Sequence, residues 1–246
     1  MSYSDIIDNR NRFLKDAIND HLKGSEEAKF AVGYLFLSGF NEIVTNIAHL
    51  DGLKLIIGST SNSQTLEEIA EGMARREELE EAAERLKYQK LTDKVAIVDT
   101  VKNTMGRNIG SLEQSEENEQ TLSSLQKLIA SGKVKIKVYT KQRLHAKAYL
   151  FKYKNETARN VGSPGIAIVG SSNLTLSGFK HSSEMNVRVK GTRNFEDLDS
   201  WFENLWSESE PFSDKFRNSL EESWALKFAY PYDLFILTLY NLVQSR

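Results

Sequence analysis

The chain has 246 residues, of which 40% are hydrophobic and 27% are charged, and it contains 3 prolines, 14 glycines and no cysteine. This composition excludes a disordered or low-complexity chain, and the lack of cysteine excludes disulfide scaffolds, thiolate metal sites and cysteine nucleophiles. The formal net charge is −2, so the chain as a whole lacks the field of a general nucleic-acid binder. No signal-peptide pattern and no apolar run of the ~20 residues that a membrane span needs are found, which predicts a cytoplasmic protein without a membrane partner.

The N-terminal part of the chain alternates predicted helices with apolar runs. Apolar residues at helical spacing predict a helix over residues 5–23 and a short helix over 41–49. Continuous apolar runs, which are typical of strands buried on both faces, cover residues 28–37 and 52–57. Residues 65–90 are rich in Glu, Ala, Arg and Leu, and we expect them to form a long surface helix.

The C-terminal part continues this alternation. The periodicity predicts helices over 122–130 and 192–206, and strands over 134–139, 144–153, 165–170 and 184–189. A polar loop is expected between the second and third of these strands, over residues 154–164. Strands that alternate with helices place the chain in the α/β class. We expect one domain over residues 1–210 and a helical, aromatic C-terminal tail over 211–246 that needs a surface to cover it.

The charges are unevenly distributed. The stretch Lys127–Arg159 contains ten basic residues and a single acid, Glu156, whereas the acids are concentrated elsewhere. A charge block of this kind is usually a solvated face, and the alternative is a local anion-binding patch that suits a phosphate-bearing substrate. Lys135 and Lys137, on the exposed face of the strand predicted over 134–139, are candidate contacts to nucleic-acid phosphates.

Three short segments carry residues suited to phosphate chemistry. Period-two alternation puts His145 and Lys147 on one face of a strand that begins at Leu144. The next strand ends in Gly170-Ser171-Ser172-Asn173, where small residues, backbone N–H groups and an amide could meet a phosphate. Glu184 begins the third strand. Taken singly, each segment also has an ordinary explanation, such as a solvated strand face or a helix cap.

Together, the three segments resemble the phospholipase D superfamily, and most of all its bacterial nuclease and restriction-endonuclease branch, in which two identical chains build one active site. The resemblance implies an α/β/α sandwich with a mixed central sheet and one His-x-Lys motif per chain. In one respect the chain departs from the family pattern, because Lys152 occupies the position where an Asp often follows the Lys. This loss weakens a lipid-hydrolase interpretation more than it weakens catalysis.

The resemblance also implies a mechanism. A neutral His145 imidazole would attack phosphorus and form a phosphohistidine, and the His145 of a second chain would protonate the leaving oxygen. Lys147 and Asn173 would hold the phosphate oxygens, and Glu184 would orient the imidazole. Ser171 and Ser172 are further candidate phosphate donors. No metal ion or other cofactor is needed for this chemistry.

Three functions remain open at this point. The first is a DNA nuclease that acts as a homodimer. The second is a non-catalytic DNA-binding or targeting module, because similar domains occur at the N-terminus of helicase polypeptides and residues 224–232 resemble the segment that leads into such an ATPase domain. The third, a phospholipid hydrolase or transferase, is disfavoured by the single motif copy and by Lys152.

Overall fold

The strands form one mixed sheet. The computed structural model describes residues 4–58, 94–142 and 144–227. Within this part, eight strands are hydrogen-bonded in the order β1-β7-β6-β5-β2-β3-β4-β8. Their bounds are β1 Ile6–Ile7, β2 Ser25–Val32, β3 Gly52–Gly58, β4 Val134–Tyr139, β5 Ala148–Tyr153, β6 Gly165–Gly170, β7 Asn186–Val189 and β8 Glu210–Pro211.

The centre of the sheet is parallel and its flanks are antiparallel. β2, β3 and β4 run in the same direction, and Phe30, Leu55 and Ile136 lie side by side in their register. β5, β6 and β7 then alternate in direction on one flank. β2, β3 and β4 are rich in buried apolar residues, and each also carries a lysine on the face covered by α9. The strands expected over 134–139 and 165–170 are found with those bounds.

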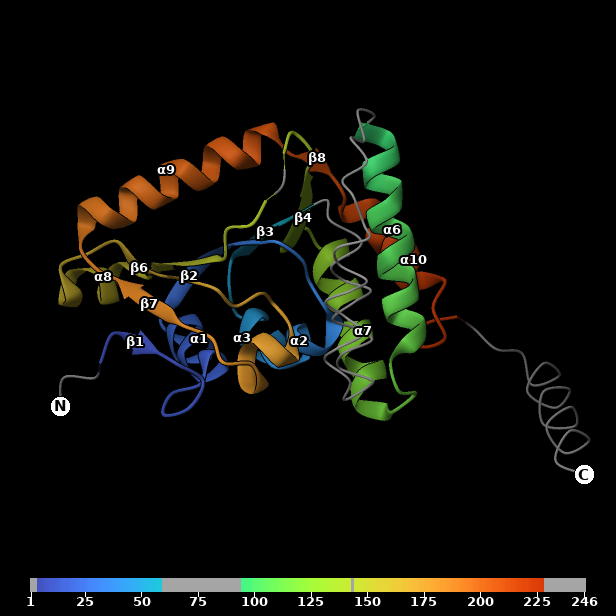
Figure 1. The fold of residues 1–246 in the computed structure, drawn as a ribbon, viewed down its shortest axis with the longest axis horizontal. Coiled ribbons are helices and arrows are strands. Elements are labelled where there is room, and N and C mark those ends of the chain that lie inside the picture. The colour runs from blue at the N-terminus through green and yellow to red at the C-terminus, as the bar shows by residue number, and fades with distance from the viewer. Residues whose placement is uncertain (1–3, 59–93, 143, 228–246) are drawn as a thin grey trace, which may run out of the picture.

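Helices cover both faces of the sheet (Figure 1). On one face α9 packs through Phe195 and Phe202. The larger helical layer and a π-helical turn contribute to the main core on the other face. The helical elements are α1 Leu14–Lys23, α2 Leu37–Asn41, α3 Val44–Ile47, α6 Lys94–Ser111, α7 Glu116–Ala130, α8 Asn155–Val161, η1 Ser177–His181, α9 Thr192–Glu208 and α10 Ser213–Glu221. The predicted α/β/α sandwich with a mixed sheet is therefore confirmed.

The N-terminal segment differs from the helix expected over residues 5–23. Helix α1 begins only at Leu14, and Ile6 and Ile7 pair with β7. Asn9 adopts a left-handed conformation with φ 55°, and its side-chain oxygen accepts a hydrogen bond from Leu14 N at 3.0 Å. Asp8 also accepts bonds from the backbone of the residues that follow it. These local side-chain bonds compete with the helix and delay its start.

Several other boundaries differ because they depend on distant partners. β2 ends at Val32 instead of continuing to residue 37, and residues 41–49 contain the end of α2 and the separate helix α3. The loop expected over 154–164 contains α8, while α7 begins at Glu116, where Ser115 caps it. Helix α6 was not expected, and the helix predicted over 65–90 lies outside the described residues.

The expected domain boundary at residue 210 falls inside β8, which pairs with β4. Phe212, Phe216 and Leu220 are buried in the main core, so the first part of the predicted tail packs on this domain. Residues 228–246 lie outside the described part of the chain. No helix in the described ranges is both long enough and apolar enough to cross a membrane.

One histidine is half-buried beneath the β1–β7 flank. His21 packs against the ring of Phe151, and its Nε2 accepts a hydrogen bond from Arg188 Nε at 3.1 Å. Burial lowers the pKa of His21 to about 4, and the positive charges of Arg188 and Arg12 add to this effect. The side chain is therefore a neutral hydrogen-bond acceptor at neutral pH.

We predict that His21 makes the fold sensitive to acid. The imidazole takes up a proton near pH 6.5 in the unfolded chain and only near pH 4 in the folded protein. The free energy of unfolding therefore keeps its full His21 contribution above pH 6.5 and loses it as the pH falls toward 4. The loss is at most about 3 kcal/mol, since one pKa unit corresponds to about 1.4 kcal/mol. Urea unfolding at several pH values should give a shallower acid-induced loss for His21→Gln, which keeps an acceptor for Arg188. Equal slopes for the two proteins would contradict the prediction.

Candidate active site

The three segments that carry the predicted site residues meet at one edge of the sheet. β5 is antiparallel to β6, and β6 is antiparallel to β7. The start of β5, the end of β6 and the start of β7 therefore share an edge. His145 and Lys147 directly precede β5, Asn173 follows β6, and Glu184 precedes β7. The carboxyl ends of the parallel strands β2, β3 and β4 point to this same edge.

His145 and Lys147 lie before the strand and not within it. The strand was expected to begin at Leu144, but β5 begins at Ala148 because β2, its partner, ends at Val32. The His145 side chain is exposed, whereas Lys147 is buried. Lys147 Nζ donates a hydrogen bond to the carbonyl oxygen of His145 at 3.0 Å. The ammonium group is thus held beside the backbone of the candidate nucleophile.

Asn173 connects the turn after β6 to the end of β2. Its side-chain oxygen accepts hydrogen bonds from Gly33 N at 3.0 Å and Tyr34 N at 3.4 Å. A Cβ atom on Gly33 would lie 3.1 Å from that oxygen, so glycine permits the close approach. With Oδ1 accepting these bonds, the Nδ2 group, which carries the donors of the Asn173 amide, is left to bond to a phosphate oxygen.

The two serines of the turn have different surroundings. Ser172 is fully buried, and its N–H and hydroxyl groups bond to the two ends of the Asn186 amide, at 3.4 and 2.9 Å. Tyr149 donates its hydroxyl proton to the carbonyl of Ser172 at 2.8 Å. Ser172 thus has a structural role here, while Ser171 is exposed at the site edge. The sequence reasoning did not assign roles to Tyr149 and Asn186, which look like an ordinary strand aromatic and a turn amide.

Glu184 contacts the turn directly. Its carboxylate accepts a hydrogen bond from the Ser171 hydroxyl, which also receives the N–H of Met185 at 3.1 Å. Burial, followed by the negative charge of Glu184, raises the pKa of Tyr149 well above its usual value. Tyr149 therefore stays protonated and keeps its hydroxyl as a donor to the turn.

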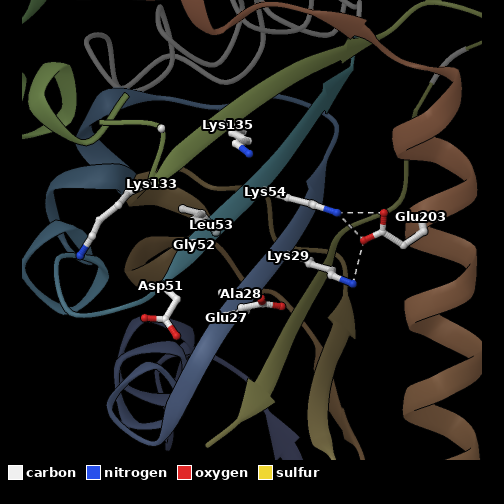
Figure 2. Close-up of a pocket in the computed structure, with 11 residues that line it drawn as sticks. Glu27, Ala28, Lys29, Asp51, Gly52, Leu53, Lys54, Lys133, Lys135 and Glu203 are labelled. Atoms are coloured by element: carbon white, nitrogen blue, oxygen red, sulfur yellow. Dashed lines mark hydrogen bonds and ion pairs between the residues drawn. The ribbon is translucent and has the colours of Figure 1, made fainter. Parts of the chain in front are cut away.

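Lys135 and Lys137 lie on β4, three strands away from β5 in the sheet. Lys137 is level with Ala148 at the start of β5, whereas Lys135 lies two residues further from this edge. Lys137 Nζ donates to the carbonyl of Trp206 at 2.8 Å and lies 4.8 Å from the centre of its ring. Lys135 lines a pocket of about 390 Å³ formed where β2, β3 and β4 begin, at the edge opposite to His145 (Figure 2).

The basic stretch Lys127–Arg159 is dispersed by the fold. Lys141 is paired with Glu208 at 2.8 Å, and Lys152 with Glu26 at 3.0 Å. Lys133 bonds to the carbonyl of Ala48 at 2.8 Å, near the opposite edge from the candidate site. The linear block is therefore not one continuous basic surface, and acids from other segments neutralise part of it.

No group of three or more metal-ligating His, Asp or Glu side chains occurs in the described residues. The chemistry available at the edge comes from an imidazole, an ammonium, an amide and a carboxylate. This set can supply a nucleophile, hold an anionic phosphate and orient a side chain.

A family model described as "Cardiolipin synthase, PLD-like domain" matches residues 47–206, which is more than half of the chain. The chain belongs to this phospholipase-D-like family. The match includes the His-x-Lys segment, the turn with Asn173 and the position of Glu184. No curated protein sequence matches the chain significantly.

Three bacterial proteins are among the solved structures with a similar backbone. Nuc from Salmonella typhimurium, a phospholipase D family member, has 11% identity and a TM-score of 0.44, over 84% of this chain and 95% of Nuc. NucT from Helicobacter pylori has 12% identity and a TM-score of 0.39, over 80% of this chain and 89% of NucT. The phosphatidylserine synthase of Haemophilus influenzae has 10% identity and a TM-score of 0.48, over 97% of this chain and 44% of the synthase. We infer no activity from similarities at this identity.

The bonds to Asn173 predict that this residue has two separate roles. Its Oδ1 atom supports the fold, and its Nδ2 group would contact the substrate. Asn173→Ala leaves the N–H groups of Gly33 and Tyr34 without their acceptor, which should lower the free energy of unfolding by about 1–3 kcal/mol. Asn173→Asp keeps an acceptor oxygen for both N–H groups, while it replaces the Nδ2 donor by a negatively charged oxygen, so it should be more stable than the Ala variant. Urea unfolding of both variants measures the difference. A loss below about 0.5 kcal/mol for Asn173→Ala would contradict the anchoring role.

Proposed function

We propose that this protein is a phosphodiesterase that cleaves nucleic acid, with DNA as the substrate, through a phosphohistidine on His145. The observation that carries the proposal is the convergence of His145, Lys147, Asn173 and Glu184 at one edge of the sheet. DNA is favoured over lipid by the resemblance to the nuclease branch, namely the single motif and Lys152 in place of the usual Asp.

The proposed reaction has two displacements. In the first, the imidazole of His145 forms a bond to phosphorus while the bond from phosphorus to the leaving oxygen breaks and that oxygen takes a proton from a second imidazole. In the second, water loses a proton to that imidazole and displaces the histidine from phosphorus. Lys147 and the Nδ2 group of Asn173 stabilise the charge on the non-bridging oxygens.

Lys147 can hold a phosphate oxygen while it keeps its present hydrogen bond. Its ammonium donates one hydrogen bond to the carbonyl of His145 in the structure. Because an ammonium has three donors, another N–H can bond to a phosphate oxygen, and a charged acceptor makes this bond stronger than one to a carbonyl. The bond to the carbonyl keeps the ammonium close to the site.

The second imidazole is proposed to be His145 of a second copy of the chain. His21 is half-buried and bonded to Arg188, and His49 bonds to the carbonyl of Leu22. His181 is exposed but ends η1 and has no Lys two residues later. Two-fold pairing is the commonest symmetry of protein oligomers and would bring two copies of His145 together.

Exposed apolar side chains beside the candidate site support such pairing. Met185 is 63% exposed, Ile6 44% and Val187 38%, and Ile6 and Val187 are register partners at the β1–β7 flank. Met185 lies next to Glu184 and bonds to Ser171 through its backbone. An apolar strip at the edge of the site would be buried if two sites faced each other.

The catalytic assignment predicts cleavage of plasmid DNA in the presence of EDTA. His145→Ala should reduce the cleavage rate at least roughly a thousandfold, because the nucleophile is lost. His181→Ala, which removes another exposed histidine near the same turn, should keep the wild-type rate. Release of a phospholipid headgroup instead of DNA cleavage would contradict the substrate class, and unchanged cleavage by His145→Ala would contradict the assignment of the nucleophile.

The pairing predicts a homodimer. Light scattering at micromolar concentration should give twice the mass of the chain. Val187→Lys places a charge in the exposed apolar strip, so it should shift the protein toward the monomer and lower DNA cleavage together. Lys190→Gln, at an exposed position on the same flank, serves as a control and should change neither property. A monomeric wild-type protein that cleaves DNA would overturn the shared site.

A second candidate is a non-catalytic DNA-binding or targeting module, linked to a downstream helicase or ATPase domain. The observation in its favour is the sequence of residues 224–232, which resembles the segment that leads into such an ATPase domain. Binding of DNA without cleavage, unaffected by His145→Ala, would support this candidate over the nuclease.

A further inference from the structure

Three lysines form a row across the parallel strands. Lys29 of β2 is the register partner of Lys54 of β3, and Lys54 is the register partner of Lys135 of β4. Register partners on neighbouring strands point to the same face of the sheet, and this row lies on the face covered by α9. Like charges placed side by side in this way lower stability. The row therefore needs negative charges to balance it.

Helix α9 balances only part of the row. Glu203 pairs with Lys29 at 2.8 Å and with Lys54 at 2.7 Å, and Asp199 pairs with Lys29 at 2.5 Å. Burial alone would raise the pKa of Glu203, but its hydrogen bonds with Lys29 and Lys54 lower it. Lys135 is exposed and makes no ion pair with an acid in the described ranges. Figure 2 shows Lys29 and Lys54 reaching Glu203, with Lys135 beside them.

The unbalanced end of the row borders a pocket. The pocket has a volume of about 390 Å³, and Lys54, Lys135 and Lys133 lie along it. Asp51 and Glu27 also line it, from the segments at the start of β3 and β2. The volume lies within the range of ~300–1,000 Å³ that is usual for small-molecule sites.

We propose that this pocket binds the phosphate group of a small, hydroxyl-bearing phosphate monoester such as a sugar phosphate. Neighbouring strands are ~4.8 Å apart, so the ammonium groups of Lys54 and Lys135 can both contact oxygens of one phosphate. The bound dianion supplies the negative charge that the row lacks next to Lys135. Carboxylates at Asp51 and Glu27 accept hydrogen bonds from hydroxyl groups of the ligand.

This site is separate from the proposed catalytic edge. The pocket lies where β2, β3 and β4 begin, whereas His145 and Asn173 lie at the opposite edge of the sheet. The inference therefore does not rest on the proposed nuclease activity. A variant in the pocket should leave DNA cleavage in EDTA unchanged, so the two proposals fail independently.

Isothermal titration of the full chain with ribose 5-phosphate, at constant ionic strength, tests the site. Lys135→Gln should weaken binding about tenfold or more, since one charge-assisted hydrogen bond is lost. Lys137→Gln is the matched control, because it removes the same charge from the same strand and face but outside the pocket. Inorganic phosphate should bind more weakly than ribose 5-phosphate. If the two ligands bind with the same affinity, the site is assigned to free phosphate.

Stability gives a second, independent measurement. Without ligand, Lys135→Gln should raise the urea midpoint, because it relieves repulsion within the lysine row. Lys137→Gln should not raise it, because it loses the bond to Trp206. Three results would each overturn the proposal. The wild-type protein could fail to bind ribose 5-phosphate, the Lys135→Gln variant could bind it with equal affinity, or that variant could lose DNA binding.

Discussion

The side-chain amide of Asn173 is the contact on which the candidate site depends. By accepting hydrogen bonds from Gly33 and Tyr34, it joins the end of β2 to the turn after β6, two segments that are distant in the sequence. The same junction lets β2 leave the sheet after Val32, so the segment with His145 and Lys147 continues beyond its strand partner. Gly58 is packed more closely still, because a Cβ there would lie 2.4 Å from the carbonyl oxygen of Gly33. A substitution that shifts the backbone at this junction would therefore move several candidate catalytic groups together.

Local patterns predicted the α/β class and the strands over 134–139 and 165–170, whereas the grouping of the three motif segments came from the family resemblance. The local patterns depend on alternation and apolar runs that are read within one strand. The limits of β2 and β5 could not be read in this way, because each ends where its partner leaves the sheet. The roles of Asn186 and Tyr149 were equally hidden, since their importance comes from bonds to Ser172 in another strand's turn. Whether His145, Lys147, Asn173 and Glu184 act in catalysis remains a prediction.

Charge is the property for which the linear sequence was least informative. The stretch Lys127–Arg159 looks like one basic patch, yet β4 and the following segments carry its lysines to opposite edges of the sheet. Acids from β2 and α9 then neutralise Lys152 and Lys141. The row of Lys29, Lys54 and Lys135 shows the opposite case, because these residues are distant in sequence and adjacent in the sheet. Sheet register, rather than position along the chain, determines which charges act together.

Helix α9 connects the charged row to the rest of the fold. Its apolar side, with Phe195 and Phe202, packs on the sheet, while Asp199 and Glu203 on the neighbouring turns reach Lys29 and Lys54. The aromatic ring of Trp206 lies 5.4 Å from Lys54 Nζ and 4.8 Å from Lys137 Nζ, so it covers lysines in two successive rows. The more buried members of the row, Lys29 and Lys54, are paired with these acids, whereas the exposed Lys135 makes no ion pair among the described residues. Its ammonium borders the pocket, and this is the position at which the proposed anion would bind.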